Sequence, residues 1–121
     1  MTKIHRLLHK IVFFILLLNG LVWGQKEYSM ESLILNGDSY TRKFSEEVVN
    51  GSVYIMMGDI KVVIGKMRNG KQYDRWVYWW DNGLKQSEGS YALGKKYGEW
   101  IYYDSLGIKD SLIHYKNNLR D

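Results

Sequence analysis

Two adjoining stretches of the chain carry one pattern: Gly65-Lys-Met-Arg-Asn-Gly-Lys-Gln-Tyr-Asp-Arg-Trp-Val-Tyr-Trp-Trp-Asp-Asn-Gly-Leu-Lys85 and Gly89-Ser-Tyr-Ala-Leu-Gly-Lys-Lys-Tyr-Gly-Glu-Trp-Ile-Tyr-Tyr-Asp-Ser-Leu-Gly-Ile-Lys109. They are offset by 24 residues without a gap, and the offset continues from Tyr91 to Tyr115 into a truncated third copy. A fixed period of this length is typical of repeat architectures, in which each unit buries its apolar face against its neighbours. The pattern therefore predicts a stacked array.

Each copy has the residue order of a β-hairpin. Glycine-containing segments that predict turns alternate with aromatic and β-branched runs that predict strands. No apolar period of 3.6 residues, which an amphipathic helix would need, follows residue 24. We therefore expect an all-β protein, a single-layer antiparallel array of β-hairpins preceded by an N-terminal signal-peptide helix. The expected strands of the clear copies are Trp76–Trp80, Leu84–Tyr91, Trp100–Tyr103 and Ile108–Tyr115.

Aromatic residues recur at equivalent positions, and we expect them to form rows across the array. Burying one ring removes on the order of 150–250 Å² of surface from water, and this stabilises the fold by at most roughly 4–6 kcal/mol. Ring rows can thus replace the disulfides of other small exported domains, since the chain has no Cys. Strand side chains alternate between two faces, so some rings should remain partly exposed. The expected pairs are Trp76 with Trp100, Tyr78 with Tyr102, Trp79 with Tyr103, and Tyr91 with Tyr115.

Residues 1–24 have the features of a targeting segment. Positive residues precede the apolar run Ile11–Leu18, and Val22-Trp23-Gly24 offers a cleavage site. From Ile11 to Gly24 a helix would span about 21 Å, less than the roughly 30 Å hydrocarbon core of a membrane. We therefore expect a cleaved signal peptide and an exported protein, periplasmic, in the cell envelope or secreted. The alternative is a membrane anchor formed by residues 11–24.

Residues 25–64 predict a degenerate β-meander that contains a decayed copy of the repeat, with Ser52 in place of the Trp. Asn50-Gly51 is typical of a two-residue hairpin turn, and Gly58-Asp59 predicts another turn. We expect a three-stranded antiparallel meander. Its strands would be Val48-Val49, Val53–Met57 and Ile60–Ile64. Residues 65–121 then hold the two clear repeats and the truncated third.

The charge of the mature chain is nearly balanced. The formal net charge is +4, but residues 25–121 hold 14 Lys and Arg against 13 Asp and Glu. A net charge of +1 is weak support for nucleic-acid binding, and export disfavours it further. We expect no nucleic-acid partner.

The second copy resembles the variant form of the membrane occupation and recognition nexus (MORN) repeat. The resemblance rests on Gly89, Gly94, Lys95, Gly98, Trp100, Tyr102, Tyr103, Gly107 and Lys109. The first copy departs from that pattern at Asp74, where glycine is usual, and at Trp79, where Tyr is usual. The resemblance covers about 50 residues well, and it implies a hairpin array with a membrane or protein scaffolding role and no catalytic residue. Some proteins that resemble the family carry an antitoxin label, which an export signal disfavours for this chain.

A second, weaker resemblance is to cell-wall-binding repeats of choline-binding type, which implies aromatic contact with a ligand of the cell wall. Exposed aromatics interleaved with Lys suit protein partners, glycans or anionic lipid headgroups at a membrane surface. We expect a non-catalytic binding module that contacts a protein or the envelope surface. The alternative is a carbohydrate or cell-wall binding module with an aromatic ladder. The candidate binding residues are Trp76, Trp79, Trp100, Tyr103, Lys85 and Lys109.

Catalytic chemistry has few candidates in this sequence. His114 is the one His after residue 24, and Cys is absent, so a His-based triad or zinc site lacks its usual residues. A pair of carboxylates beside aromatics would suit a glycosidase, but turns and edge strands also carry carboxylates. We expect no enzyme activity, no metal and no cofactor. The carboxylates concerned are Asp81, Glu88, Glu99, Asp104 and Asp110.

Overall fold

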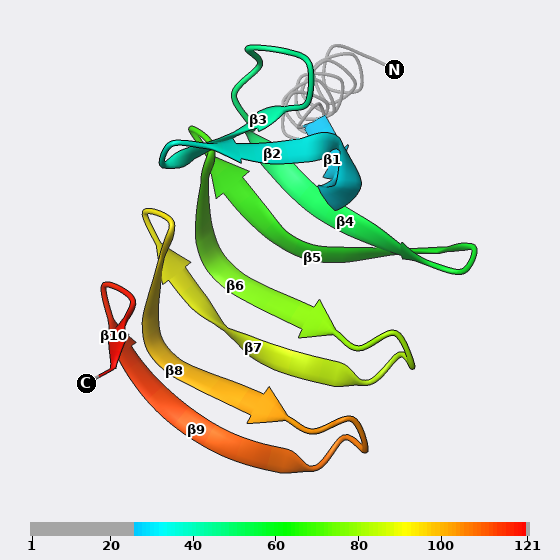
Figure 1. Ribbon diagram of the computed structural model, residues 1–121, viewed down its shortest axis with the longest axis vertical. Coiled ribbons are helices and arrows are strands. Elements are labelled where there is room, and N and C mark those ends of the chain that lie inside the picture. The colour runs from blue at the N-terminus through cyan, green and yellow to red at the C-terminus, as the bar shows by residue number, and fades with distance from the viewer. Residues whose placement is uncertain (1–25, 121) are drawn as a thin grey trace, which may run out of the picture.

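The computed structural model describes residues 26–120, so the targeting segment predicted over residues 1–24 lies outside the described residues. One curved sheet of 8 strands dominates the molecule (Figure 1). No helix within residues 26–120 is long and apolar enough to cross a membrane. The expected all-β hairpin array is confirmed. In spatial order the strands are β1 (Lys26–Ser29), β4 (Gly51–Met57), β5 (Ile60–Arg68), β6 (Lys71–Trp79), β7 (Lys85–Ala92), β8 (Lys95–Tyr103), β9 (Lys109–Lys116) and β10 (Leu119–Arg120).

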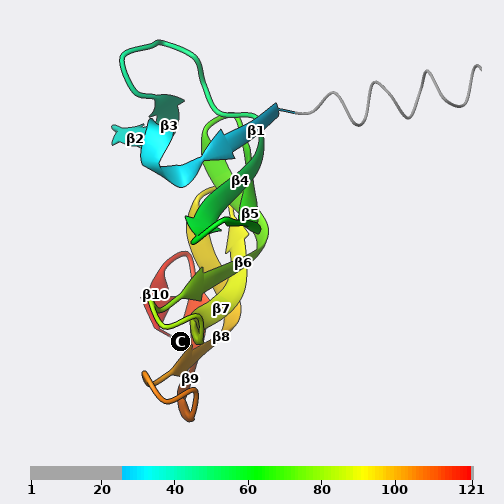
Figure 2. The same cartoon turned by 90° about the vertical axis from the view of Figure 1, so that its right-hand side faces the viewer.

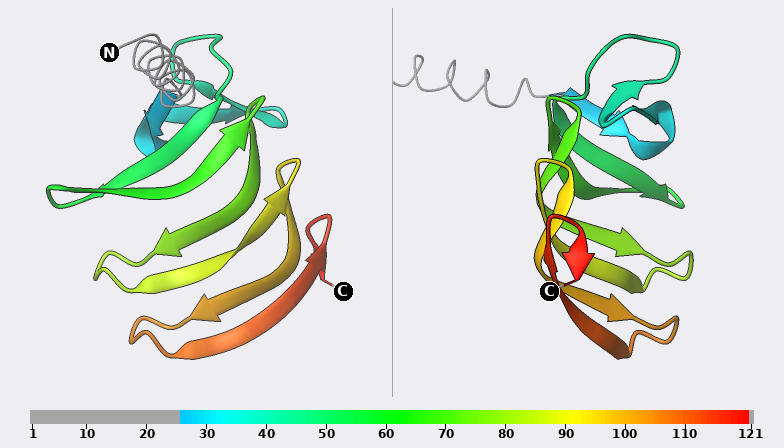
Figure 3. Two further views of the ribbon diagram at one scale, coloured as in Figure 1. Left: turned by 180° about the vertical axis from the view of Figure 1, so that it is seen from behind. Right: turned by 60° about the vertical axis from the view of Figure 1, so that its left-hand side comes forward.

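From β4 to β10, each strand pairs antiparallel with the next one along the chain. Three long hairpins result, β4–β5, β6–β7 and β8–β9, and their tips lie along one edge of the sheet (Figure 1). Figure 3 shows the same stack from behind, with the β5–β6, β7–β8 and β9–β10 turns along the opposite edge.

β6 and β8 each bend where one residue adopts a positive φ. These residues are Asp74, with a φ of 59°, and Gly98, with a φ of 73°, at equivalent places in the two copies. Asp tolerates the left-handed region better than most residues, so Asp74 keeps the bend although it replaces the usual glycine. The sheet is curved (Figure 1), and one of its faces, which we call the inner face, holds most of the core.

The core of the inner face is a row of rings in which Trp and Tyr alternate. Trp76 and Trp100 are both 0% exposed. Tyr91 lies edge-on between them, with ring centroids 5.9 Å from Trp76 and 5.1 Å from Trp100. Tyr78 bridges the same two indoles at 6.0 and 6.2 Å, and its hydroxyl hydrogen-bonds the Tyr91 hydroxyl at 2.9 Å. The equivalent Tyr102 and Tyr115 hydroxyls are 2.8 Å apart. Equivalent rings thus recur along one row, but Trp76 and Trp100 do not contact each other as expected, because Tyr78 and Tyr91 lie between them.

Each indole lies flat on a glycine of the preceding hairpin. A Cβ added at Gly65 would overlap the ring of Trp76, and a Cβ at Gly89 would overlap the ring of Trp100. The Trp76 Nε1–H donates to the Lys66 carbonyl, and the Trp100 Nε1–H donates to the Ser90 carbonyl, both at 3.0 Å. Each clear repeat therefore specifies an indole ring, a glycine that leaves space for the ring, and a backbone carbonyl that hydrogen-bonds to the indole N–H.

The N-terminal end of the sheet is covered by a separate cap. β1 pairs parallel with β4. The chain then forms a short 3₁₀ turn, η1 (Met30–Ser32), and the hairpin of β2 (Leu33–Asn36) with β3 (Ser39–Arg42), which stands beside β1 in Figure 2.

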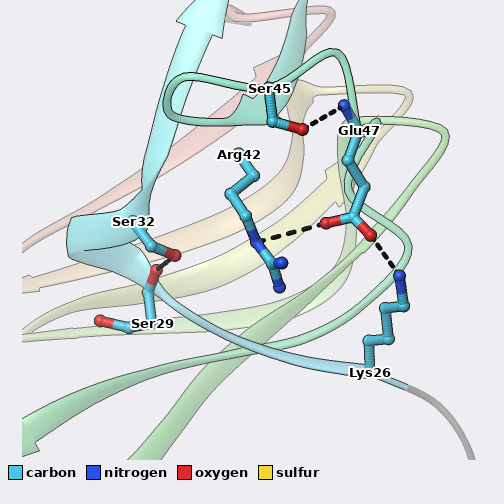
Figure 4. A network of polar contacts seen from close by, with 6 residues as sticks. All are labelled: Lys26, Ser29, Ser32, Arg42, Ser45 and Glu47. Carbon is cyan, nitrogen blue, oxygen red and sulfur yellow. Dashed lines mark hydrogen bonds and ion pairs between the residues drawn. The ribbon is translucent and has the colours of Figure 1, made fainter.

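Tyr28 and Leu33 of this cap are buried with Val49 and Val53. Glu47 ties the cap together by pairing with Lys26 and, at 3.2 Å, with Arg42 (Figure 4).

The expected hairpin at Asn50-Gly51 is wrong. Val48 forms an isolated bridge with Thr41, and Gly51 instead begins β4, against β1. A Cβ at Gly51 would overlap the Lys26 carbonyl oxygen, so this glycine serves a close approach of two backbones. The Asn50 side-chain carbonyl accepts a hydrogen bond from the backbone N–H of Asn69 at 2.8 Å and thereby supports the β5–β6 turn.

The decayed copy is otherwise present as the β4–β5 hairpin, with its turn at Gly58-Asp59 as expected. Val53, and not Ser52, lies opposite Gly65, at the place where Trp76 lies opposite Gly89. A bulge after Val53 restores the register, so the first copy is displaced by one residue at this point.

Candidate functional site

Four of the six predicted binding residues come together at the base of two neighbouring hairpin tips. Trp79 and Lys85 are cross-strand partners in β6 and β7, and Tyr103 and Lys109 are the equivalent partners in β8 and β9. Cross-strand partners share a face of the sheet. The predicted aromatic and cationic residues thus form two matching pairs, one per repeat.

Trp76 and Trp100 do not belong to this surface. Both side chains are 0% exposed in the inner-face core, so neither can contact a partner while the fold is intact. Alternation along the strand places Trp79 on the face opposite Trp76, but the sequence could not tell which of the two faces is buried.

Sequence reasoning missed an apolar row along the same edge. Ile60, Leu84 and Ile108 occupy equivalent positions at intervals of 24 residues. They are 68%, 41% and 61% exposed. Each is followed directly by a Lys, so the unit of an exposed branched side chain and a cation occurs three times. The period contained this signal, but it could not show that these side chains face water.

We call the combined surface the tip surface. Successive hairpins are two strands apart, so equivalent residues recur about every 10 Å along it. Its residues are Ile60, Lys61, Trp79, Leu84, Lys85, Tyr103, Ile108 and Lys109.

The second and third tips are tied to each other by hydrogen bonds. The Trp80 indole N–H donates to the Asp104 carbonyl at 3.1 Å, and the Asn82 side-chain amide donates to the Ser105 carbonyl at 2.7 Å. Within the third tip, the Asp104 carboxylate accepts from the backbone N–H groups of Leu106 and Ile108 at 2.9 and 3.0 Å. These bonds hold Leu84 and Ile108 in place although both are exposed.

An ion cluster lies between the two aromatic–lysine pairs. Glu88 accepts from Lys85 at 2.7 Å and from Arg75 at 2.9 Å, and the Tyr103 hydroxyl lies 3.4 Å away. The hydrogen bond from Lys85 is the main reason that the pKa of Glu88 is lowered. The cluster fixes Lys85 and Tyr103 on the outer face, opposite the ring row.

A pocket separates the first tip from the second. It has a volume of about 330 Å³ and is lined by Ile55, Met56, Met57, Gly58, Trp79, Trp80, Asp81, Asn82 and Gly83. The first tip is a two-residue turn, whereas five residues connect β6 to β7 and β8 to β9. The shorter tip leaves a space here, whereas hydrogen bonds join the next two tips.

A larger cavity of about 540 Å³ lies at the opposite edge, among the β5–β6, β7–β8 and β9–β10 turns and the β2–β3 hairpin. Glycine and asparagine turns line it together with apolar and polar side chains. Lys71 and Asp38, which both line it, form an ion pair at 3.4 Å. We assign it no function.

Four of the acid–base candidates have structural partners. Asp104 caps a turn, Glu88 is held by two cations, and His114 lies 3.8 Å from Glu99 on neighbouring strands. Residues 26–120 contain no group of three or more His, Asp or Glu side chains that could hold a metal ion.

Comparison of the chain with protein-family models finds no match. Neither the curated proteins nor the solved structures contain a match.

Proposed function

We propose that this protein is an exported, non-catalytic binding module that contacts a protein of the cell envelope through the tip surface. The observation that carries the proposal is the row of Ile60, Leu84 and Ile108, exposed at one position of the 24-residue period in three successive hairpins. Their large exposed fractions mean that burial at these positions contributes little to the fold. Apolar side chains that gather on a surface are typical of contact sites.

The neighbouring residues support a protein partner. Lys61, Lys85 and Lys109 each follow one of the apolar side chains. Lys61 is paired with Glu27 at 2.8 Å and Lys85 with Glu88 at 2.7 Å, so this edge carries both cations and carboxylates beside an apolar strip, which suits a partner surface of mixed charge. Trp79 and Tyr103 add rings, and aromatic residues are enriched among the side chains that contribute most to protein interfaces. The resemblance to MORN repeats, which implies a scaffolding role, agrees with this proposal. Export rests on the targeting segment in the sequence.

Site-specific photo-crosslinking in the host cell tests the proposal. A photoreactive residue would replace Leu84 or Ile108 on the tip surface, and Leu93, which is 79% exposed at the opposite edge, provides the matched control. We expect a discrete protein adduct from Leu84 and Ile108 and none from Leu93. The charge reversal of Lys85→Glu with Lys109→Glu should weaken the adduct.

The same adducts from all three positions, or no adduct from the tip positions, would contradict the proposal. Adducts with lipid alone would instead indicate peripheral membrane contact.

The pocket between the first two tips supports a second candidate function, carbohydrate or cell-wall binding. Trp79 and Trp80 line it together with Asp81, and indole rings beside a carboxylate can hold a sugar by stacking and hydrogen bonding. Titration with soluble peptidoglycan fragments, followed by Trp fluorescence, tests this candidate. A shift that Trp79→Ala abolishes would favour it, and the absence of a shift would exclude these fragments as ligands.

A further inference from the structure

The second and third hairpin tips have the same backbone structure. In the second tip the Gly83 N–H donates to the Trp80 carbonyl at 3.0 Å. In the third tip the Gly107 N–H donates to the Asp104 carbonyl at 3.0 Å. The φ angles of the two glycines are 85° and 84°. Equivalent carbonyl groups of the two tips therefore point in equivalent directions.

In the third tip, two carbonyl groups point toward the second tip and are hydrogen-bonded by it. The Trp80 indole N–H donates to the Asp104 carbonyl, and the Asn82 side-chain amide donates to the Ser105 carbonyl. Because a carbonyl oxygen has two lone pairs, the Asp104 carbonyl accepts from Trp80 and from Gly107 at once. Planar N–H groups of the second tip thus fill the gap to the third.

The equivalent carbonyl groups of the second tip, those of Trp80 and Asp81, have no such donors. Apart from the Gly83 N–H, no group in residues 26–120 donates a hydrogen bond to either of them. The first tip contributes Met57 and Gly58 to the pocket between the two tips, and neither side chain has an N–H group. The pocket therefore lies where the repeat pattern leaves two acceptors without donors.

The pocket also offers negative charge and aromatic rings. Asp81 lines it, and this exposed carboxylate forms no ion pair in the described part of the chain. Lys61 and Lys85 of the tip surface are both paired with glutamates. Trp79 and Trp80 contribute their indoles to the wall. A group that fits this pocket should therefore be planar, carry positive charge and donate several N–H hydrogen bonds.

We propose that the pocket binds the guanidinium group of an arginine side chain of the partner protein. This rests on the function proposed above, because the arginine belongs to the protein bound at the tip surface, of which Trp79 is part. A guanidinium is planar, always charged and presents five N–H donors in a fixed fork. It donates to the Trp80 and Asp81 carbonyls, pairs with the Asp81 carboxylate and stacks on an indole. A pocket of about 330 Å³ is at the small end of ligand sites, which suits a single side chain.

The Trp79 indole N–H is also without a partner among the described residues, but it is not part of this acceptor set. It is buried from solvent. The equivalent side chain, Tyr103, contacts Glu88, whereas Ile64 stands 24 residues before Glu88 and offers no acceptor. The sequence of the first copy therefore explains this unpaired N–H without a ligand.

Titration of the full chain in mild detergent with N-acetyl-arginine amide tests the proposal, with the indole N–H signals of Trp79 and Trp80 followed by NMR. N-acetyl-lysine amide and tetramethylammonium are the controls, because the first has N–H donors without a planar fork and the second has charge without any donor. We expect the arginine compound to shift both indole signals with a millimolar Kd. The lysine compound should bind at least threefold more weakly, and tetramethylammonium should leave the signals unchanged.

Asp81→Asn should weaken binding of the arginine compound by about threefold or more, the size of a partly exposed ion pair. Asp110→Asn, which removes an exposed carboxylate of β9, should leave it unchanged and is the matched control. Equal shifts with tetramethylammonium would overturn the proposal, since charge and rings alone would then suffice. A shift with soluble peptidoglycan fragments and none with the arginine compound would also overturn it and assign the pocket to sugars.

Photo-crosslinking from Leu84 and Ile108 is independent of this pocket, because neither residue lines it. A protein adduct from those positions together with no arginine binding would overturn the guanidinium site alone. Arginine binding without a protein adduct would support the site and contradict only the proposed function.

Discussion

At the scale of single residues, the fold depends on glycines that make room for rings. Gly65 and Gly89 do not adopt a positive φ, so any residue could adopt their backbone conformation. These positions are restricted to glycine because the indoles of Trp76 and Trp100 occupy the space that a Cβ would need. Each indole is also hydrogen-bonded to the residue after its glycine. Glycine and Trp therefore form one structural unit across two hairpins.

Gly89→Ala should destabilise the protein by about 2–4 kcal/mol. The added methyl group displaces the Trp100 ring in a close-packed core, where overpacking typically costs about 1–3 kcal/mol, and the hydrogen bond to Ser90 is strained as well. Urea unfolding followed by Trp fluorescence measures the change. Gly58→Ala is the control, because Gly58 has a φ of 59° and open space around it and should lose about 1 kcal/mol from backbone strain alone. A smaller loss for Gly89→Ala than for Gly58→Ala would contradict the packing argument.

Residue identity predicted the ring row but not the exposure of each ring. The period placed Trp76, Tyr78 and Trp100 correctly relative to one another. It did not show that Trp76 and Trp100 are buried and that Trp79 is partly exposed, because alternation along a strand separates the two faces but does not tell which face holds the core. The exposed row of Ile60, Leu84 and Ile108 was missed for the same reason.

At the scale of the structural element, a lysine covers the aromatic rings at the C-terminal end of the array. The Lys96 ammonium lies 4.8 Å from the ring centroid of Trp100, 5.4 Å from that of Tyr102 and 5.1 Å from that of Tyr115. It also donates to the Tyr102 hydroxyl at 3.0 Å. The equivalent residue of the preceding repeat is Gln72, whose side-chain amide donates to Tyr78 at 2.9 Å. Gln72 is buried between two repeats, whereas Lys96 faces the end of the array.

Lys96→Gln should lower the free energy of unfolding by roughly 1 kcal/mol, because the amide keeps the hydrogen bond but loses the cation–π attraction. Lys95→Gln, one residue earlier and over no ring in the described residues, should change it by less than about 0.5 kcal/mol. Chemical unfolding of both variants measures these changes in the free energy of unfolding. Equal changes for the two substitutions would show that the cation–π attraction of Lys96 does not stabilise the fold.

The paired tyrosines predict a loss of stability at alkaline pH. Burial is the main reason that the pKa values of Tyr78 and Tyr91 are raised, and a hydrogen bond with Tyr102 raises the pKa of Tyr115. A phenol whose pKa is higher in the folded state stabilises the protein fully below the unfolded value of about 10. This stabilisation is lost as the pH rises above that unfolded pKa.

We therefore expect the free energy of unfolding to fall as the pH rises above about 10. The tyrosinate absorbance of the folded chain should stay below that of the urea-unfolded chain at the same pH. Tyr91→Phe should make the fall shallower, and this comparison separates the tyrosines from lysines that titrate in the same range. Equal tyrosinate absorbance of folded and unfolded chains would contradict this explanation.

Hairpin order was largely predictable from turn residues, with one failure. Gly58-Asp59 and the glycine turns of the clear copies formed as expected. Asn50-Gly51 did not form a hairpin, because β1 from the start of the described chain took the place beside β4. A local turn signal cannot report that a distant segment will pair there, and the parallel pairing of β1 with β4 leaves no local pattern.

At the scale of the whole molecule, the inner face holds the fold together and the hairpin tips leave apolar side chains exposed. The buried rings repeat with the same period as the exposed residues of the tip surface, so the array presents these exposed residues at regular intervals. The N-terminal cap and the free edge of β9 give the array two different ends.

The most direct test of the account is hydrogen exchange of the Trp indole N–H groups in the folded chain, measured by NMR. The account predicts that the Nε1 protons of Trp76 and Trp100 exchange only through global unfolding, with free energies of opening that agree with the urea value and with each other. Exchange of either proton at the rate of an exposed indole would contradict the claim that the two rings form one continuous core.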